Sequence, residues 1–294
     1  MKISYKFFIV FTFLFTFSIS YACDFCGCAT NGGSLGMLNY NTNSFLGSRY
    51  IHQSYRTNDG LYSNSAWRNE AYNTLHILGK LNLGKNFFVS AVVPFHFHDR
   101  ETTAQSIHLS GLGDVSVLGG YKFLDTNFHE LQFSGGIKLP TGKYDENANG
   151  SINPGFQLGT GSFDYLANID YRFKFKNWVW INNLNYNIKT TNDEEYRFGN
   201  QLNVASAIGY AFKSNTFQLL PSTGIASEIY EANEFFGNKV LHTSGDITLL
   251  KIATDVSFKK MSFGFQFQSP LNQNLNGGLV KSQYRSSVYL NYNF

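Results

Sequence analysis

Three cysteines, Cys23, Cys26 and Cys28, form the most reactive stretch of the sequence, "CDFCGC", and no cysteine follows in the rest of the 294-residue chain. Three thiolates this close together could converge on one soft ion such as Cu(I) or Zn(II). A disulfide is the usual use of thiols in an exported protein, but a bridge between Cys23 and Cys26 would leave one thiol over. Lipidation of Cys23 is a third use, and it would leave Cys26 and Cys28 cramped for a bridge. The sequence leaves these uses open, and lipidation does not exclude metal capture by the other two thiols.

Two histidines, His96 and His98, stand two residues apart in "PFHFHD", so on a strand they would share one face. Such paired imidazoles could bind a transition metal, although the lining of a polar interior is the simpler use of this pattern. The chain contains no HExxH zinc motif and no Walker phosphate loop. Most histidines fall on polar faces or in predicted loops, which disfavours the outward-facing Ser–His pair of barrel lipases. The sequence therefore predicts no catalytic residues and no enzymatic activity.

The segment before the cysteines has the pattern of a secretory signal. Two lysines precede the mostly apolar stretch "FFIVFTFLFTF" at 7–17, which is too short to span a bilayer as a helix. Small residues, Ser20 and Ala22, occupy the −3 and −1 positions of a cleavage site, which would make Cys23 the first residue of the mature chain. A lipoprotein signal would also place Cys23 there, although Ser20 stands where such a signal usually has leucine. The predicted organisation is a signal peptide at 1–22, a Cys-containing N-terminal segment and flexible linker at 23–43, and an outer-membrane β-barrel at 44–294.

The composition favours an exported β-protein. Charged residues make up 15% of the chain, against about a quarter in ordinary soluble domains, while aromatic residues reach 17%. The formal net charge of +3 is too small to indicate a nucleic-acid partner. No later stretch is apolar over the roughly 20 residues that a membrane-spanning helix needs. An aromatic-rich exported chain of this kind is typical of a transmembrane barrel, in which lipid-facing and lumen-facing residues alternate.

Apolar and polar side chains alternate along most of the chain. In "MSFGFQFQ", Met261, Phe263 and Phe265 would face one side of a strand, and Ser262 and Gln266 the other. Twelve such segments lie near residues 44–56, 70–83, 86–99, 111–124, 129–140, 156–175, 178–189, 195–213, 215–230, 245–259, 261–271 and 281–294. Short turns and long polar loops connect them in alternation, and the strand number is even, as in outer-membrane barrels. The pattern predicts an all-β, antiparallel transmembrane barrel of about twelve strands with both termini on the short-turn side, in the periplasm.

A soluble β-sandwich would also alternate. It would not usually repeat the rhythm of long and short connections through a dozen strands, nor load one face with so many aromatic side chains. The last segment, "SSVYLNYNF", alternates up to the aromatic Phe294, which resembles the signal read by the outer-membrane assembly machinery. We therefore expect the partners to be the lipid bilayer, this assembly machinery and small solutes. The expected location is the outer membrane of a Gram-negative bacterium.

The polar face of the predicted strands would line the lumen. Its charged members carry both signs, and they are Asp114, Lys138, Asp164, Asp170, Arg172, Arg197, Lys251, Asp255 and Arg285. Such a lining suits a polar pore for small solutes, and equally a lumen that its own ion pairs close. The channel would be narrow, because the interior width of a barrel grows with strand number.

Four stretches in the later part of the chain carry a family resemblance: "SGLGDVSVLGGYKF" (110–123), "GGIKLPTGKY" (135–144), "GFQLGTGSFDYL" (155–166) and "QSPLNQNLNG" (268–277). Together and in this order they resemble Bacteroidetes-type outer-membrane barrels described as phenol-degradation meta-pathway or transporter-like proteins. The resemblance implies an envelope barrel that acts as a channel or transporter for small solutes, hydrophobic or aromatic as the family name suggests. The cysteine cluster is not part of this match. It leaves a second function open, a metal-handling envelope protein in which Cys23, Cys26 and Cys28 bind Cu or Zn beside a largely structural barrel.

Overall fold

The computed structural model of the chain describes residues 44–58, 66–101, 106–145, 147–148 and 151–294. The predicted signal peptide and linker lie outside the described residues, and so do Cys23, Cys26 and Cys28. No helix in the described part of the chain is long and apolar enough to cross a membrane. The one helix there is a short 3-10 helix, η2, at Asn276–Gly278.

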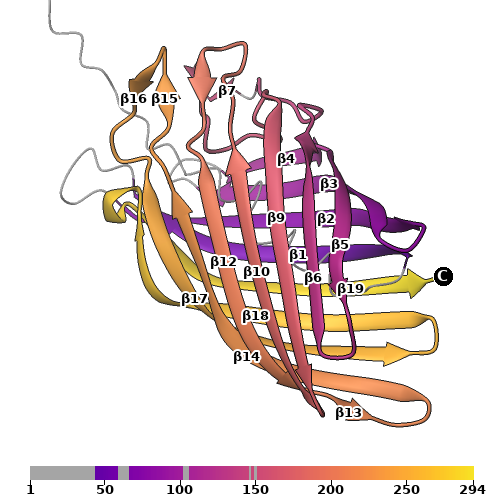
Figure 1. Cartoon of the computed structure of the whole chain (residues 1–294). Helices are drawn as coiled ribbons and strands as arrows, with labels where there is room; N and C mark the ends of the chain where they lie inside the picture. The colour runs from indigo at the N-terminus through magenta and orange to yellow at the C-terminus, as the bar shows by residue number, and fades with distance from the viewer. Residues whose placement is uncertain (1–43, 59–65, 102–105, 146, 149–150) are drawn as a thin grey trace, which may run out of the picture.

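One antiparallel sheet closes on itself to form a barrel (Figure 1). Its strands are β1 (Phe45–Thr57), β2 (Arg68–Leu83), β3 (Phe87–Glu101), β4 (Ser106–Leu112), β5 (Ser116–Asp125), β6 (His129–Lys138), β9 (Asp164–Phe175), β10 (Trp178–Ile188), β12 (Gln201–Tyr210), β13 (Phe212–Lys213), β14 (Phe217–Tyr230), β17 (Gly245–Phe258), β18 (Met261–Leu275) and β19 (Val280–Asn293). The ring closes because β1 pairs with β19 along its whole length. Two wall positions are shared by successive strands, since β4 and β5 both pair with β3, and β12 and β13 both pair with β14. Fourteen strands thus occupy twelve wall positions, and the predicted twelve-stranded antiparallel barrel is confirmed.

The two ends of the barrel differ in their connections. Short turns join β2 to β3, β5 to β6, β9 to β10 and β17 to β18 at one end, here called the short-turn end. The wall also begins and finishes there, because Phe45 pairs with Asn293. The opposite, long-loop end carries two small sheets, one of β11 (Tyr196–Arg197), β15 (Glu234–Phe235) and β16 (Asn238–Lys239), and one of β7 (Asn147–Ala148) and β8 (Ser151–Ile152). Figure 1 shows the labelled strands β7, β15 and β16 standing beyond the wall at this end.

The wall has an apolar outside and a mostly polar inside. On β18, Met261, Phe263 and Phe265 are 40%, 49% and 41% exposed, while Ser262 and Gln266 between them are 8% and 6% exposed. The same alternation follows the other long strands, because successive side chains of a strand point to opposite faces. An exposed apolar face of this extent suits lipid rather than water.

The sequence placed three strand starts too early. The segment expected at 111–124 is divided, because β4 ends at Leu112 and β5 begins only at Ser116. The segment 156–175 was expected to be one strand, but β9 begins only at Asp164, and residues 153–163 turn into the barrel instead. This stretch, here called the inner segment, contains Gly161, whose φ of +69° breaks an extended strand. The segment 195–213 divides in a similar way, because Tyr196–Arg197 forms β11 in a separate sheet and the wall resumes at Gln201.

Candidate functional site: the barrel lumen

The charged residues expected in the lumen lie on the inner face of the wall, with Arg197 as the exception. Asp114, Lys138, Asp164, Asp255 and Arg285 are buried, and Asp170, Arg172 and Lys251 are half-buried. The lining divides along the barrel axis into a closed long-loop half, a polar middle and an open mouth at the short-turn end.

Arg197 lies outside the barrel wall. It belongs to β11, where its guanidinium Nε donates a hydrogen bond of 3.1 Å to a Glu234 carboxylate oxygen on β15. This hydrogen bond holds the pKa of Glu234 below its ordinary value. The prediction that Arg197 lines the lumen assumed one unbroken strand over 195–213, and the strand break at 198–200 moves the side chain into the small sheet.

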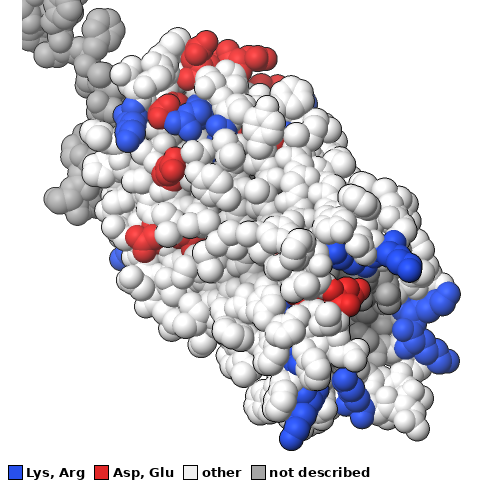
Figure 2. Space-filling view, viewed as in Figure 1, with Lys and Arg blue, Asp and Glu red and all other residues white. Residues whose placement is uncertain are grey.

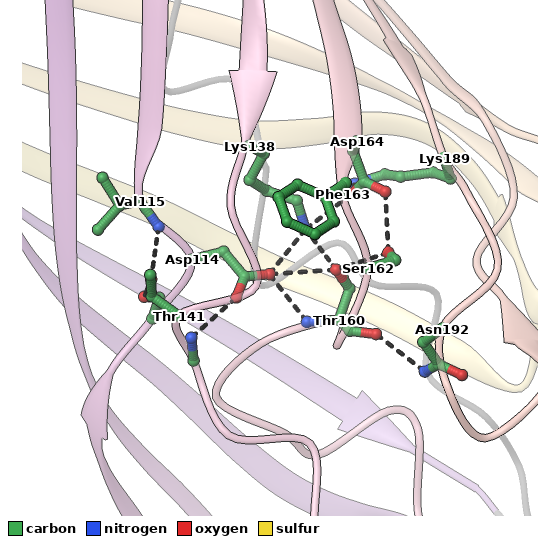
Figure 3. Close-up of polar contacts among 12 residues, drawn as sticks. Asp114, Val115, Lys138, Thr141, Thr160, Ser162, Phe163, Asp164, Lys189 and Asn192 are labelled. Carbon is green, nitrogen blue, oxygen red and sulfur yellow. Dashed lines mark hydrogen bonds and ion pairs between the residues drawn. The ribbon is translucent and has the colours of Figure 1, made fainter.

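Four charged side chains form a closed network beneath the long-loop end (Figure 3). The Lys138 ammonium lies 2.7 Å from a carboxylate oxygen of Asp114 and 2.7 Å from one of Asp164. Lys189 approaches the same Asp164 oxygen at 3.2 Å. Burial and the neighbouring Lys138 charge lower the pKa of Lys189 to about 8. Two carboxylates and two ammonium groups balance, which is the condition under which buried ions are tolerated.

The network fixes the inner segment in place. The Thr160 N–H donates to Asp114 at 2.8 Å, and the Ser162 hydroxyl donates to Asp164 at 2.9 Å. The Asn192 amide donates to the Thr160 carbonyl at 2.9 Å from the loop after β10. Figure 3 shows these groups converging from separate parts of the chain. The inner segment is therefore held by charge-assisted hydrogen bonds at its C-terminal half.

Close backbone approach explains a glycine in the inner segment. A Cβ on Gly159 would lie 2.7 Å from the Gly142 carbonyl oxygen and would also meet the Asp114 carboxylate. Gly159 donates its N–H to the Lys143 carbonyl at 3.0 Å, so the two chain segments run in direct contact. Any side chain at position 159 would push the inner segment away from the network.

An apolar cluster fills the lumen at the long-loop end. It consists of Tyr55, Tyr72, Leu109, Phe156, Leu158, Ala226, Tyr230, Ile247, Leu249, Leu275 and Val280, here called the apolar plug. Leu109 on β4 and Ile247 on β17 belong to opposite sides of the ring, so the plug spans the lumen. Phe156 is 3% exposed, and the Arg100 guanidinium lies over its ring, 4.3 Å from the ring centroid. The lumen is thus closed by packed side chains at this end.

The middle of the lumen is polar and internally bonded. Arg285 donates two hydrogen bonds, of 2.6 and 3.0 Å, to the Glu228 carboxylate, which also accepts from the Tyr230 hydroxyl. The Tyr289 hydroxyl donates to Asp255 on a neighbouring part of the wall. A ladder of amide and hydroxyl groups crosses four strands through Ser134, Asn168, Asn185, Asn203 and Gln201. Small solutes passing this level would meet hydrogen-bonding groups that already have partners.

The short-turn end opens into a cavity of about 500 Å³, here called the basic vestibule. Its cationic lining residues are Arg172, Lys174, Lys176, Lys213 and Lys259. The single acidic lining residue is Glu130. Figure 2 shows Lys and Arg gathered around this end, while Asp and Glu gather mainly at the opposite end. The mouth at the short-turn end therefore carries an excess of positive charge, whereas the long-loop end carries both signs.

His96 and His98 lie on the inner face of β3, with ring centroids 4.7 Å apart and each side chain about 1% exposed. The Nδ1 atom of His96 lies 2.9 Å from the Thr74 hydroxyl oxygen. Across the described residues, no group of three or more His, Cys, Asp or Glu side chains is placed to hold a metal ion. The pair alone offers two ligands, and metal binding by it stays a prediction.

Sequence reasoning missed several interior charges. Asn185 and Asn187 on β10 point into the lumen at alternate positions, and Lys189 continues this alternation one residue beyond the end of the strand. The alternation could therefore have predicted that Lys189 lies in the lumen. Glu228 lies on β14, where small residues such as Gly224 and Ala226 hold the inward positions and weaken the alternation. Its partner Arg285 was expected in the lumen, but no spacing rule linked two residues 57 positions apart.

Comparisons with known proteins agree with this architecture. A family described as "Putative MetA-pathway of phenol degradation" matches residues 57–274. An outer membrane channel from Pseudomonas putida F1 is similar in structure, with a TM-score of 0.65 and 14% identity over 86% of this chain and 96% of that chain. The β domain of the Bordetella autotransporter BrkA has a TM-score of 0.53 and 8% identity, covering 86% of this chain and 100% of that one. No curated protein matches the chain in sequence.

Proposed function

The chain belongs to the MetA-pathway phenol-degradation family, and on that premise we propose that it is an outer-membrane channel for small apolar or aromatic solutes. The barrel lies in the outer membrane of a Gram-negative bacterium. The short-turn end faces the periplasm, as short turns do in bacterial outer-membrane barrels, and the long-loop end faces outward. In this arrangement a solute enters through the apolar plug and leaves through the basic vestibule.

The apolar plug is the observation that carries the proposal. Nine of its eleven members stand on wall strands, and only Phe156 and Leu158 belong to the inner segment. Those two side chains can leave the plug without disturbing the wall. A solute with an apolar body can then take their place against the same apolar surface, whereas an inorganic ion or a sugar has no such body and would only lose its hydration. The inner segment thus acts as a gate that favours solutes with an apolar body.

Two further observations support the proposal. The similar protein from Pseudomonas putida F1 is itself an outer membrane channel. The matched family takes its description from phenol degradation, and phenol is a small aromatic compound. Neither observation points to catalysis, and we assign no catalytic residue.

The test is single-channel conductance of the refolded protein in a planar bilayer. We expect Phe156→Ala to raise the open conductance or the open fraction, because it removes the largest gate side chain from the plug. Phe163→Ala is the matched control, since Phe163 is 57% exposed and lies outside the plug. Phenol or toluene should reduce the ionic current of the Phe156→Ala channel by occupying the vacated surface. A protein that conducts in neither form, or equal currents in both variants, would contradict the gate.

The metal-handling alternative rests on Cys23, Cys26 and Cys28, which lie outside the described residues. No observation among the described residues favours it. It stays a prediction from sequence, to be tested by metal titration of the protein against a variant with all three cysteines replaced by serine.

A further inference from the structure

The basic vestibule carries an excess of positive charge that its own residues do not balance. Five cationic side chains and one carboxylate line the cavity, so its formal charge is five minus one, or +4. A cavity of about 500 Å³ falls within the usual size of a small-molecule site. A concave wall of one charge sign concentrates the opposite ion, because the low-dielectric wall focuses the field.

The one carboxylate is already engaged by two of the cations. Glu130 accepts from the Arg172 guanidinium at 2.6 Å and also pairs with the Lys174 ammonium. Among the described residues, no carboxylate lies within ion-pair distance of Lys176, Lys213 or Lys259. Lys176 and Lys259 lie 5.6 and 5.3 Å from the ring centroids of their chain neighbours, and these ring contacts leave their charge uncompensated. Three ammonium groups are therefore available to an anion.

The vestibule also has an apolar floor. Val179, Ala211 and Leu220 are 8%, 1% and 2% exposed and pack together as one cluster, and all three line the cavity. An inorganic ion would gain nothing from this surface. These three side chains leave only a small accessible surface, so a small flat body such as one aromatic ring can rest against them while an anionic group on the same molecule lies among the lysines.

We propose that the basic vestibule binds small organic monoanions with an apolar body, with aromatic carboxylates as the chemical class. This inference rests on the proposed function, because it narrows the solutes of the same channel to those with an anionic group. The apolar plug selects the body of the solute, and the vestibule retains its charge at the opposite mouth. A neutral aromatic compound would pass the plug but would not be held in the vestibule.

Isothermal titration of the full barrel in phosphatidylcholine nanodiscs tests the proposal without requiring conductance. We expect benzoate to bind and benzamide, its neutral counterpart of similar shape, to bind roughly tenfold more weakly or not at all. Benzoate affinity should fall as sodium chloride rises, since salt screens exposed charges. Equal affinities for benzoate and benzamide would overturn the assignment of charge recognition.

Two double variants locate the site. Lys213→Gln with Lys259→Gln removes two uncompensated vestibule charges and should weaken benzoate binding roughly tenfold. Lys85→Gln with Lys260→Gln is the matched control, because these lysines lie at the same end of the barrel but not among the vestibule's lining residues. It removes the same charge and should change the affinity less than about twofold. Equal losses in the two double variants would show that the rim charge acts generally and would overturn the site.

Two competition experiments separate the sources of the anion. Inorganic phosphate should compete weakly, and displacement of benzoate at equal concentration would show that the apolar floor plays no part and overturn the solute class. Benzoate binding should persist in nanodiscs that contain phosphatidylglycerol, and its loss there would identify lipid headgroups as the true occupants. Failure of the proposed function leaves a different signature, namely benzoate binding to a protein whose Phe156→Ala variant conducts no ions.

Discussion

The two ends of the lumen treat lysine in opposite ways. At the long-loop end, the Lys138 side chain is 2% exposed and has two carboxylates at 2.7 Å. At the short-turn end, Lys213 is exposed and lines an open cavity without a carboxylate partner among the described residues. The difference follows from solvation. A buried cation has lost its hydration and needs a partner of opposite charge, whereas an exposed cation stays hydrated and needs none. At the long-loop end, the charged side chains bind one another and hold the inner segment in place. At the short-turn end, the vestibule lysines have no carboxylate partner among the described residues and are available to a ligand.

Removing one charge from each end should give the largest contrast. Lys138→Met leaves Asp114 and Asp164 facing each other with only Lys189 nearby, and we expect it to lower the free energy of unfolding by about 3–5 kcal/mol. Lys213→Met should change the same quantity by less than about 0.5 kcal/mol, because its ammonium is hydrated and unpaired. Urea unfolding in lipid vesicles, followed by tryptophan fluorescence, measures both. Similar losses in the two variants would show that the buried and the exposed lysine contribute equally to stability, against our expectation.

A single methyl group on the inner segment should give an intermediate effect. Gly159→Ala places a Cβ against the Gly142 carbonyl, and we expect a loss of about 1–3 kcal/mol in the free energy of unfolding. The variant should also conduct more than wild type, because the inner segment has to move away from the network. Gly119→Ala on β5 is the control, since a Cβ there meets nothing within 4 Å. A stable Gly159→Ala variant with unchanged conductance would show that the inner segment tolerates displacement.

An effect smaller than that of Gly159→Ala should come from the small sheet beyond the wall. Arg197→Ala removes the ion pair with Glu234, whose two side chains are each 24% exposed. Solvent screens such a pair, so the free energy of unfolding should fall by about 0.2–1 kcal/mol. The loss should shrink further in high salt. A cost close to that of Lys138→Met would mean that β11 supports the closed end of the lumen as strongly as the buried network does.

Wall strands were predictable from the sequence because each side chain on them faces one of only two environments, the lipid outside or the lumen inside. The alternation of "MSFGFQFQ" assigned Phe265 to the outside and Gln266 to the inside, and their exposures of 41% and 6% agree. Lys138 and Arg285 were placed in the lumen for the same reason. The alternation of faces along a strand depends only on neighbouring residues, so it can be recognised without knowledge of the fold.

The inner segment was not predictable by that route. Its buried residues Phe156 and Leu158 read as the start of a strand, because they precede β9 with apolar spacing. Their true partners lie on β2, β4 and β17, far away in the sequence, and only closure of the ring brings those strands around them. The role of Thr160 was not predictable either, because its N–H donates to Asp114, which is far away in the sequence. Contacts across a lumen leave no local periodicity.

The inner segment also links assembly to gating. The stretch that contains it joins β6 to β9, so both of its ends are tied to adjacent strands of the wall. The segment can fold into the lumen from the long-loop mouth after β1 has joined β19 and the ring is complete. Until it does so, Phe156 and Leu158 are missing from the plug, and Asp114 lacks its Thr160 donor. The last step of maturation and the closing of the gate are therefore the same movement.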